Sequence, residues 1–156
     1  MNIQVRRATV EDAAAACDVI RRSIRECCGD DHREDPKVID AWLRNKTPEV
    51  IGGFIVAQDA FAVVAEVDRV ITGFAMSTGS GELMLCYVAP SARFTGVGKA
   101  LLVAIESHVT QTGVEFWHLQ STRSAREFYL RNGFVAEGSP IQAFGMQGQP
   151  MRKKLN

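Results

Sequence analysis

The sequence lacks the features that mark membrane-spanning, secreted and nucleic-acid-binding proteins. No apolar stretch approaches the roughly 20 residues that a helix needs to cross a bilayer, and no basic segment followed by an apolar one suggests a secretion signal. The 18 basic and 18 acidic residues cancel, so no general attraction to nucleic acid or to an anionic membrane is expected. These absences predict a cytoplasmic protein whose partners are neither nucleic acid nor membrane.

Cysteine is also scarce, and the chain is of modest length. Four cysteines without an export signal indicate free thiols rather than a disulfide framework. Cys27, Cys28 and His32 lie among acidic residues, but they are too few and have no familiar ligand spacing, so no metal site is predicted. The 156 residues suffice for one domain, 1–156, around a single core.

Hydrophobic periodicity predicts a mixed α/β fold with the order β-α-α-β-β-β-α-β-α-β-β. The expected strands cover residues 3–8, 61–67, 70–77, 83–88, 115–119, 134–137 and about 149–154, with a further strand-like run at 54–57. The expected helices cover about 13–27, 36–48, 97–110 and 122–131. Thr9 and Asp12 form a variant of the capping box before the first helix. Gly73, inside an expected strand, indicates a bulge or a close backbone approach.

The most informative stretch is 83–104, which is typical of a strand, a loop and a helix. In the loop, Gly96 and Gly98 allow backbone amides to turn toward an anion where the helix begins. Arg93 and Lys99 add positive charge. The pattern therefore predicts a site for phosphate or pyrophosphate.

Two well-known phosphate loops do not fit this stretch. A P-loop requires Gly where Arg93 stands, and it requires Ser or Thr, to hold magnesium, where Ala100 stands. A dinucleotide-binding fingerprint requires a third Gly where Leu101 stands. The ligand is therefore expected to be a different phosphate compound.

The pattern Arg93-x-x-Gly96-x-Gly98 resembles the pyrophosphate loop of the GNAT superfamily of N-acetyltransferases. A second element, residues 125–134, resembles that family's Ala-x-x-Phe-Tyr-x-x-x-Gly-Phe segment and follows at the expected distance. The resemblance runs loosely over nearly the whole chain and closely over 83–134. It implies the GNAT fold, in which the strands that contain residues 83–88 and 115–119 run parallel and splay apart to admit acetyl-CoA as cosubstrate.

The resemblance also implies the site residues. Tyr129 matches the family's general acid, and the backbone amide of Cys86 matches the donor to the thioester oxygen. Glu82 matches the position where some members place a catalytic base, with Glu66 as a weaker alternative. The residues expected to bind the cofactor are Cys86, Tyr87, Val88, Arg93, Phe94, Thr95, Gly96, Val97, Gly98, Lys99, Thr122 and Phe128.

Two positions depart from the family pattern. Thr122 stands where many members have Asn, and Thr95 stands where many have Arg. Because the cradle is built mostly from backbone amides, these changes are expected to weaken side-chain contacts to the cofactor without removing the phosphate site.

The predicted function is direct transfer of an acetyl group from acetyl-CoA to a primary amine. A base would help, because deprotonating an alkyl ammonium of pKa near 10.4 at pH 7 costs roughly 4.6 kcal/mol. A covalent route through acetyl-Cys86 is chemically possible, but the resemblance favours direct transfer. The alternatives are a non-catalytic acyl-CoA-binding or regulatory module, transfer of another acyl group, and transfer to a hydroxyl.

The acceptor is not predicted by the sequence. The resemblance implies that the two N-terminal helices form its side of the cleft. The acids Glu26, Asp30, Asp31, Glu34 and Asp35 form either a solvated turn or a patch that recognises a cationic amine. A small amine, a drug, an amino acid, a polyamine and a protein amine all stay open, and an exposed edge strand is compatible with a homodimer.

Overall fold

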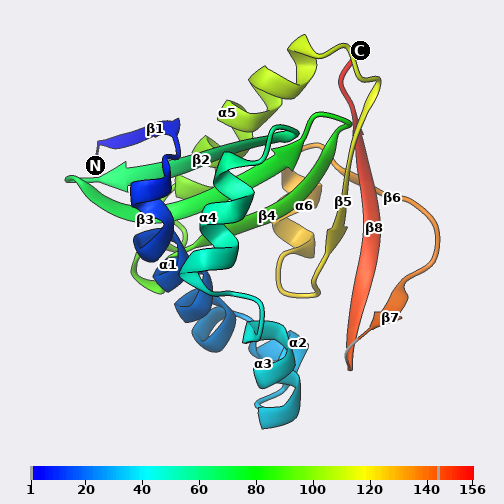
Figure 1. Cartoon of the computed structure of the whole chain (residues 1–156). Coiled ribbons are helices and arrows are strands. Elements are labelled where there is room, and N and C mark those ends of the chain that lie inside the picture. Colours follow the sequence, from blue (N-terminus) through cyan, green and yellow to red (C-terminus); the bar gives the residue numbers. More distant parts are fainter. Residues whose placement is uncertain (1, 144) are drawn as a thin grey trace.

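A twisted sheet with helices on both faces forms the centre of the computed structural model, which describes residues 2–143 and 145–156 (Figure 1). The 8-stranded sheet has the order β1-β2-β3-β4-β5-β8-β6, with β7 paired to β8. Its strands are β1 (Ile3–Arg7), β2 (Ala60–Val67), β3 (Val70–Thr78), β4 (Glu82–Val88), β5 (Phe116–Ser121), β6 (Val135–Ala136), β7 (Ile141–Ala143) and β8 (Met146–Lys154).

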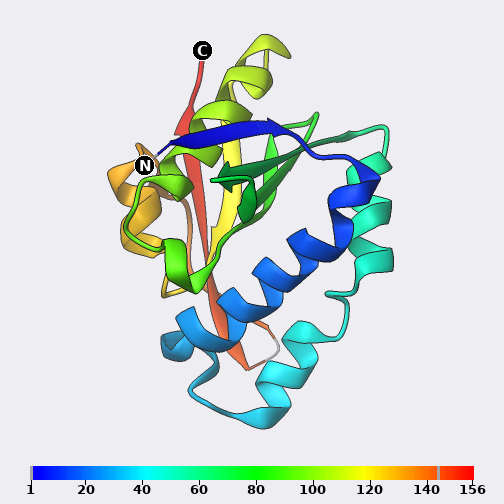
Figure 2. The ribbon, with the colours of Figure 1, turned by 90° about the vertical axis from the view of Figure 1, so that its left-hand side faces the viewer.

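The helices lie in two layers, one on each face of this sheet. The α-helices are α1 (Ala13–Cys27), α2 (Gly29–His32), α3 (Pro36–Leu43), α4 (Pro48–Val56), α5 (Val97–Gln111) and α6 (Arg126–Arg131), and two 3-10 turns are η1 (Val10–Asp12) and η2 (Pro90–Ala92). Figure 2 shows α5 and α6 on one face and α1 and α4 on the other. None of the helices in the described ranges is long and apolar enough to cross a membrane.

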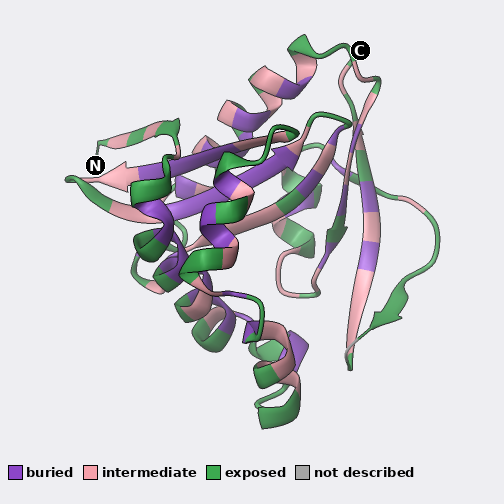
Figure 3. Cartoon of the chain, viewed as in Figure 1, coloured by how far each residue is buried: buried purple, intermediate pink, exposed green. Residues whose placement is uncertain are grey.

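Each face of the sheet has its own apolar cluster. On the α5 and α6 face the fully buried side chains include Leu101, Ile105 and Trp117. On the α1 and α4 face they include Ile20 and Phe74. The central strands are accordingly the most buried part of the chain (Figure 3). Burial of this apolar area is the main force that holds the helices on the sheet.

The predicted strand at 54–57 is wrong, because these residues form the end of α4 and the linker after it. The side chain of Thr47 caps the helix by accepting the Val50 amide at 3.2 Å, and Pro48 occupies a first-turn position that tolerates proline. Ile51 and Ile55 are buried four residues apart. A short apolar run fits a strand or a buried helix equally well, and here the cap and the packing decided for the helix.

Gly73 confirms the expected bulge and close approach. Ala65 pairs with Gly73 but Glu66 pairs with Ile71, so Thr72 is an extra residue in β3. A Cβ on Gly73 would lie 2.8 Å from Leu101 Cδ1 of α5. The glycine therefore lets α5 pack directly against the strand.

The predicted splay is present between the parallel strands β4 and β5. Their pairing covers only Glu82 with His118 and Leu83 with Leu119. Met84 is a bulge in β4, because Ser77 pairs with Leu83 and Met76 with Leu85. From this bulge onward β4 has no partner on its β5 side, and the two strands diverge (Figure 1).

Asp12 holds the first strand to the start of α1. Its carboxylate accepts two hydrogen bonds from the Arg6 guanidinium, at 2.8 and 2.9 Å, and one from the Thr9 amide at 2.8 Å, which completes the predicted capping box. The hydrogen bonds from Arg6 lower the pKa of Asp12 from 3.8 to about 2, against the opposing effect of burial.

Replacing Asp12 with asparagine is expected to lower the free energy of unfolding at pH 7 by about 1–2 kcal/mol. The folded-state pKa is depressed, so the contribution is full above pH 3.8 and is lost as the pH falls toward about 2. Urea unfolding at pH 7 and pH 2.5 should therefore show a difference between wild type and variant that shrinks in acid. Asp18→Asn, which removes only an exposed pair with Arg22 at 3.7 Å, is the control. An equal difference at both pH values would contradict this account.

Candidate active site

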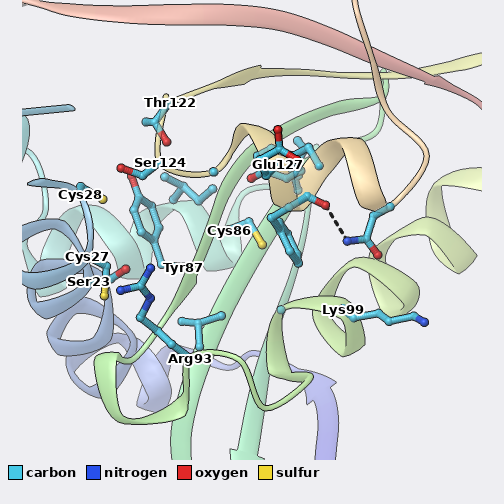
Figure 4. A pocket seen from close by; sticks show the side chains of 18 of the residues that line it. Ser23, Cys27, Cys28, Cys86, Tyr87, Arg93, Lys99, Thr122, Ser124 and Glu127 are labelled. Carbon is cyan, nitrogen blue, oxygen red and sulfur yellow. Dashed lines mark hydrogen bonds between the residues drawn. The ribbon is translucent and has the colours of Figure 1, made fainter. Parts of the chain in front are cut away.

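A cavity of about 920 Å³ lies beside the diverging strands, within the size range of small-molecule sites (Figure 4). Its walls come from β4, the loop before α5, the residues from Gln120 to Asn132 around α6, and the C-terminal end of α1. Segments far apart in the sequence thus meet around one volume.

The N-terminus of α5 supplies donors for an anion at one end of the cavity. Gly96 has a left-handed φ of 94° and turns the chain into the helix. The amide of Ala100 donates the first hydrogen bond of the helix, to Gly96 O at 3.0 Å. The amides of residues 97–99 therefore have no partner within the helix. Free amides at a helix start fit a phosphate or pyrophosphate group.

The backbone of Cys86 faces the open side of β4. The amide of Ala89, the first residue after β4, donates to Thr72 O, on the β3 side, at 2.7 Å. Because successive amides of a strand alternate in direction, those of Cys86 and Val88 point away from β3, to the side where β5 has diverged. This orientation makes the Cys86 amide a donor available to a ligand in the cavity.

Tyr129 reaches the cavity from α6. Only 7% of the residue is exposed, and its ring packs edge-on against Phe134 with centroids 5.6 Å apart. Burial raises the pKa of Tyr129 well above 10, and the nearby Cys86 contributes in the same direction. The hydroxyl therefore stays protonated at neutral pH and can act as a proton donor.

The Cys86 thiol is poorly suited to nucleophilic attack. Burial raises its pKa to about 12, while hydrogen bonding with Tyr129 opposes this rise. Since the thiolate is the nucleophilic form, the thiol of Cys86 is almost entirely in its unreactive state at pH 7. This disfavours a covalent acetyl-Cys86 route.

The cavity is predominantly cationic. Its charged lining residues, within the described ranges, are Arg93, Lys99, Arg131 and Glu127. The guanidinium of Arg93 points toward Ser23 and Cys27 of α1, whereas Lys99 points away from Cys86 (Figure 4). Positive charge around the site favours an anionic ligand.

Phe94 is an unusual residue in the loop before α5. Its φ of 62° is rare for a residue with a side chain, and the residue is 90% exposed. The Arg93 guanidinium lies 4.8 Å from the ring centroid. Phe94 thus presents an aromatic face at the edge of the cavity.

Most of the residues predicted from the sequence lie around this cavity. Those that line it are Cys86, Tyr87, Val88, Arg93, Phe94, Gly96, Gly98, Lys99, Thr122, Phe128 and Tyr129. Thr95 and Val97 are not among its lining residues: the Thr95 hydroxyl donates to Ala92 O, and Val97 is fully buried in the core. Any contact from Val97 must come from its backbone amide.

The two glutamates considered as bases lie outside the lining. Glu82 is in the part of β4 that still pairs with β5, opposite His118. Glu66 forms an ion pair with Arg6 at 2.8 Å. Neither carboxylate is placed to take a proton directly from a group in the cavity.

The cavity also has a wall that sequence patterns did not reveal. Ser23, Cys27 and Cys28 line it from the end of α1, and Gln120 of β5 and Ser124 of the loop before α6 also line it. The spacing of Ser23 and Cys27 is helical, but such spacing is common and has no specific signal for binding. Four further lining residues that were not predicted lie within the 125–134 motif and so had a sequence signal: Ala125, Glu127, Arg131 and Asn132.

Two of the five acids at and after the end of α1 have structural roles. Asp35 caps α3 by accepting the Lys37 amide at 2.9 Å, and Asp31 is buried and bound to backbone of another segment. None of the five acids of this turn lines the cavity in the described ranges. No group of three or more metal-binding side chains was found among the described residues.

The sequence and the fold both match known acetyltransferases. A family model described as an acetyltransferase (GNAT) domain matches residues 30–155. The chain belongs to the GNAT family. It is accordingly an acyltransferase that uses acetyl-CoA as cosubstrate, and the free amides of α5 in a cationic cavity fit that ligand.

Solved structures of GNAT proteins share the whole fold. The PaiA N-acetyltransferase of Thermoplasma acidophilum, in complex with coenzyme A, is 24% identical with a TM-score of 0.85, covering 99% of both chains. A GCN5-related N-acetyltransferase of Rhodopseudomonas palustris is 23% identical with a TM-score of 0.88, covering 99% of this chain and 97% of the other. A phosphinothricin acetyltransferase of Sinorhizobium meliloti, with AcCoA, is 20% identical with a TM-score of 0.74, covering 99% and 89%. No curated protein matches the chain by sequence.

Proposed function

We propose that this GNAT protein transfers the acetyl group of acetyl-CoA directly to a primary amine. The observation that carries the proposal is the meeting of three groups around one cavity: the free amides of α5, the cavity-facing amide of Cys86 and the buried hydroxyl of Tyr129. The similar folds of proteins described as N-acetyltransferases support an amine as the acceptor.

Acetyl-CoA supplies a thioester, and residues of the chain bind it, stabilise the developing charge and donate a proton. The amides of residues 97–99 hold its diphosphate, with Lys99 and Arg131 adding positive charge nearby. The amide of Cys86 donates to the thioester oxygen, where negative charge develops during attack. Tyr129 gives its proton to the departing thiolate, which requires the protonated hydroxyl that its raised pKa maintains.

Glu82 stays our candidate for the base. Because it lies outside the cavity lining, it takes the proton of the attacking amine through intervening water rather than by direct contact. The neutral Cys86 thiol takes no part in the chemistry.

The proposal is tested by measuring CoA release with a panel of acceptors. Small primary amines, amino acids, polyamines, aminoglycosides and peptide amines are each offered with acetyl-, propionyl- and succinyl-CoA. We expect acceptor-dependent release that is fastest with acetyl-CoA, together with acetylation of the acceptor nitrogen by mass spectrometry. Tight acetyl-CoA binding in isothermal titration without turnover on any acceptor would contradict the proposal and favour a binding module.

A further inference from the structure

A single buried carboxylate joins two segments of the chain that line the cavity. Asp31, in α2, is 6% exposed. Its Oδ1 accepts the amide of Arg123 at 2.6 Å, and its Oδ2 accepts the amide and the hydroxyl of Ser124 at 3.3 and 2.5 Å. These partners are 92 and 93 positions further along the chain. Hydrogen bonds to a buried carboxylate are among the stronger contacts in a protein.

The short helix that carries Asp31 is itself fixed in place. The neighbouring His32 is 1% exposed. Its Nδ1 accepts the Glu34 amide at 3.1 Å, so its Nε2 carries the hydrogen and donates to Ile24 O of α1 at 2.9 Å. The imidazole thus anchors α2, and with it Asp31, to the end of α1.

The segment that Asp31 binds leads directly to Tyr129. Residues 122–125 connect β5 to α6, and the residue that precedes α6 is Ala125, which has no side chain able to cap the helix. Asp31 instead holds the loop just before the helix, through the amides of Arg123 and Ser124. The first helical bond of Tyr129 runs from its amide to Ala125 O at 3.1 Å. The orientation of the first turn of α6, and with it of Tyr129, depends on this loop.

The other end of the connection is the α1 wall. Ser23, Cys27 and Cys28 line the cavity just before α2 begins. Thr122 and Ser124 line it from the loop that is hydrogen-bonded to Asp31 (Figure 4). Asp31 therefore spans from the helix on the acceptor side to the loop on the Tyr129 side, although its own carboxylate does not line the cavity.

We propose that Asp31 is a positioning residue for Tyr129. By fixing the loop before α6 to the α1–α2 unit, it sets the place of the Tyr129 hydroxyl relative to the Cys86 amide. This inference rests on the proposed role of Tyr129 as the general acid. Small displacements of a catalytic group are costly, because proton transfer needs hydrogen-bond distance.

The first test compares Asp31→Asn with Asp30→Asn, its exposed neighbour on the same short helix. The Asp31 variant is expected to lose at least about tenfold in kcat, while its Kd for acetyl-CoA stays within about threefold of wild type, since the α5 amides are untouched. The Asp30 variant should match wild type in both. A parallel loss of kcat and acetyl-CoA affinity would overturn the proposal, because it would indicate a general loosening of the cavity.

A double-mutant cycle separates positioning from a merely structural role. In a Tyr129→Phe background, Asp31→Asn should change kcat less than about twofold, since the group that it positions is gone. Equal factors in both backgrounds would overturn the proposal. If Tyr129→Phe alone kept full kcat, the assignment of the general acid would fail instead, so the two failures are distinguishable.

Ser124 provides the same test with a milder change. Ser124→Ala removes one of the three donors to Asp31, whereas Ser124→Thr keeps the hydroxyl. We expect a lower kcat for the alanine variant and recovery in the threonine variant, with unchanged acetyl-CoA affinity in both. If Asp31→Asn does not fold, the cycle is run with Ser124→Ala and Tyr129→Phe, and equal factors in the two backgrounds again overturn the proposal.

Discussion

Tyr129→Phe is expected to lower kcat by about 10²- to 10⁴-fold, the range typical for loss of a general acid. The substitution removes only the hydroxyl, so the packing of the ring against Phe134 is kept. Acetyl-CoA affinity by isothermal titration and the melting temperature should change little. Wild-type kcat should show no loss from ionisation of Tyr129 up to pH 10, because its raised pKa keeps the proton in place and only deprotonation at higher pH abolishes donation.

The chain offers a matched control for this result. Tyr87, its only other tyrosine, also lines the cavity but packs with the cluster on the opposite face of the sheet. Burial likewise raises the pKa of Tyr87, so a high pKa alone does not distinguish the two. Tyr87→Phe should retain kcat within about threefold. The assignment is wrong if the loss appears in the Tyr87 variant and not in the Tyr129 variant.

Gly98→Val is expected to weaken acetyl-CoA binding by at least ~100-fold, about 2.8 kcal/mol. A Cβ at this position would lie 3.0 Å from two ring atoms of Phe128 and 3.6 Å from Val88 Cγ2. The added side chain must therefore push Phe128, on α6, away from the start of α5. That movement disturbs the free amides of residues 97–99, and the added atoms fill space between the two helices. Isothermal titration with acetyl-CoA measures the effect.

Gly53→Val is the control for this substitution. Gly53 also lies in a helix, α4, but a Cβ there would meet nothing within 4 Å, so its Kd for acetyl-CoA should equal that of wild type. Gly98→Ala should give an intermediate loss, because it adds only the first atom of the clash. Unchanged affinity in both Gly98 variants would show that the start of α5 does not hold the cofactor.

Much of the fold could be predicted from local patterns. Alternating or continuous apolar runs bounded by turns marked β2, β3 and β4, and the buried face of α1 repeats at three- to four-residue intervals. The pattern was ambiguous at 54–57, where a short apolar run lacks a clear period and became helix α4. The pattern also predicted that the last helix begins at residue 122, whereas residues 122–125 form a loop and α6 begins at Arg126.

The candidate site divides in the same way. Gly96, Gly98 and Tyr129 belong to contiguous motifs, and the family resemblance that these motifs carry implied their place around one cavity. Glu82 was chosen by its position at the start of β4, but it lies where β4 is still paired with β5. The α1 wall with Ser23 and Cys27 was not foreseen, because the direction of α1 across the sheet is a tertiary property.

Local sequence was enough to predict the turn and helix start before α5 and the helix that carries Tyr129, because backbone conformation and helix starts depend on near neighbours. How far β5 diverges from β4, and which carboxylates are held in hydrogen bonds, depended on long-range packing instead. Asp31 illustrates the reason. Its partners lie 92 and 93 positions away, and no local pattern records a contact at that distance, so an acid that the sequence offered for amine recognition became a link between the walls of the site.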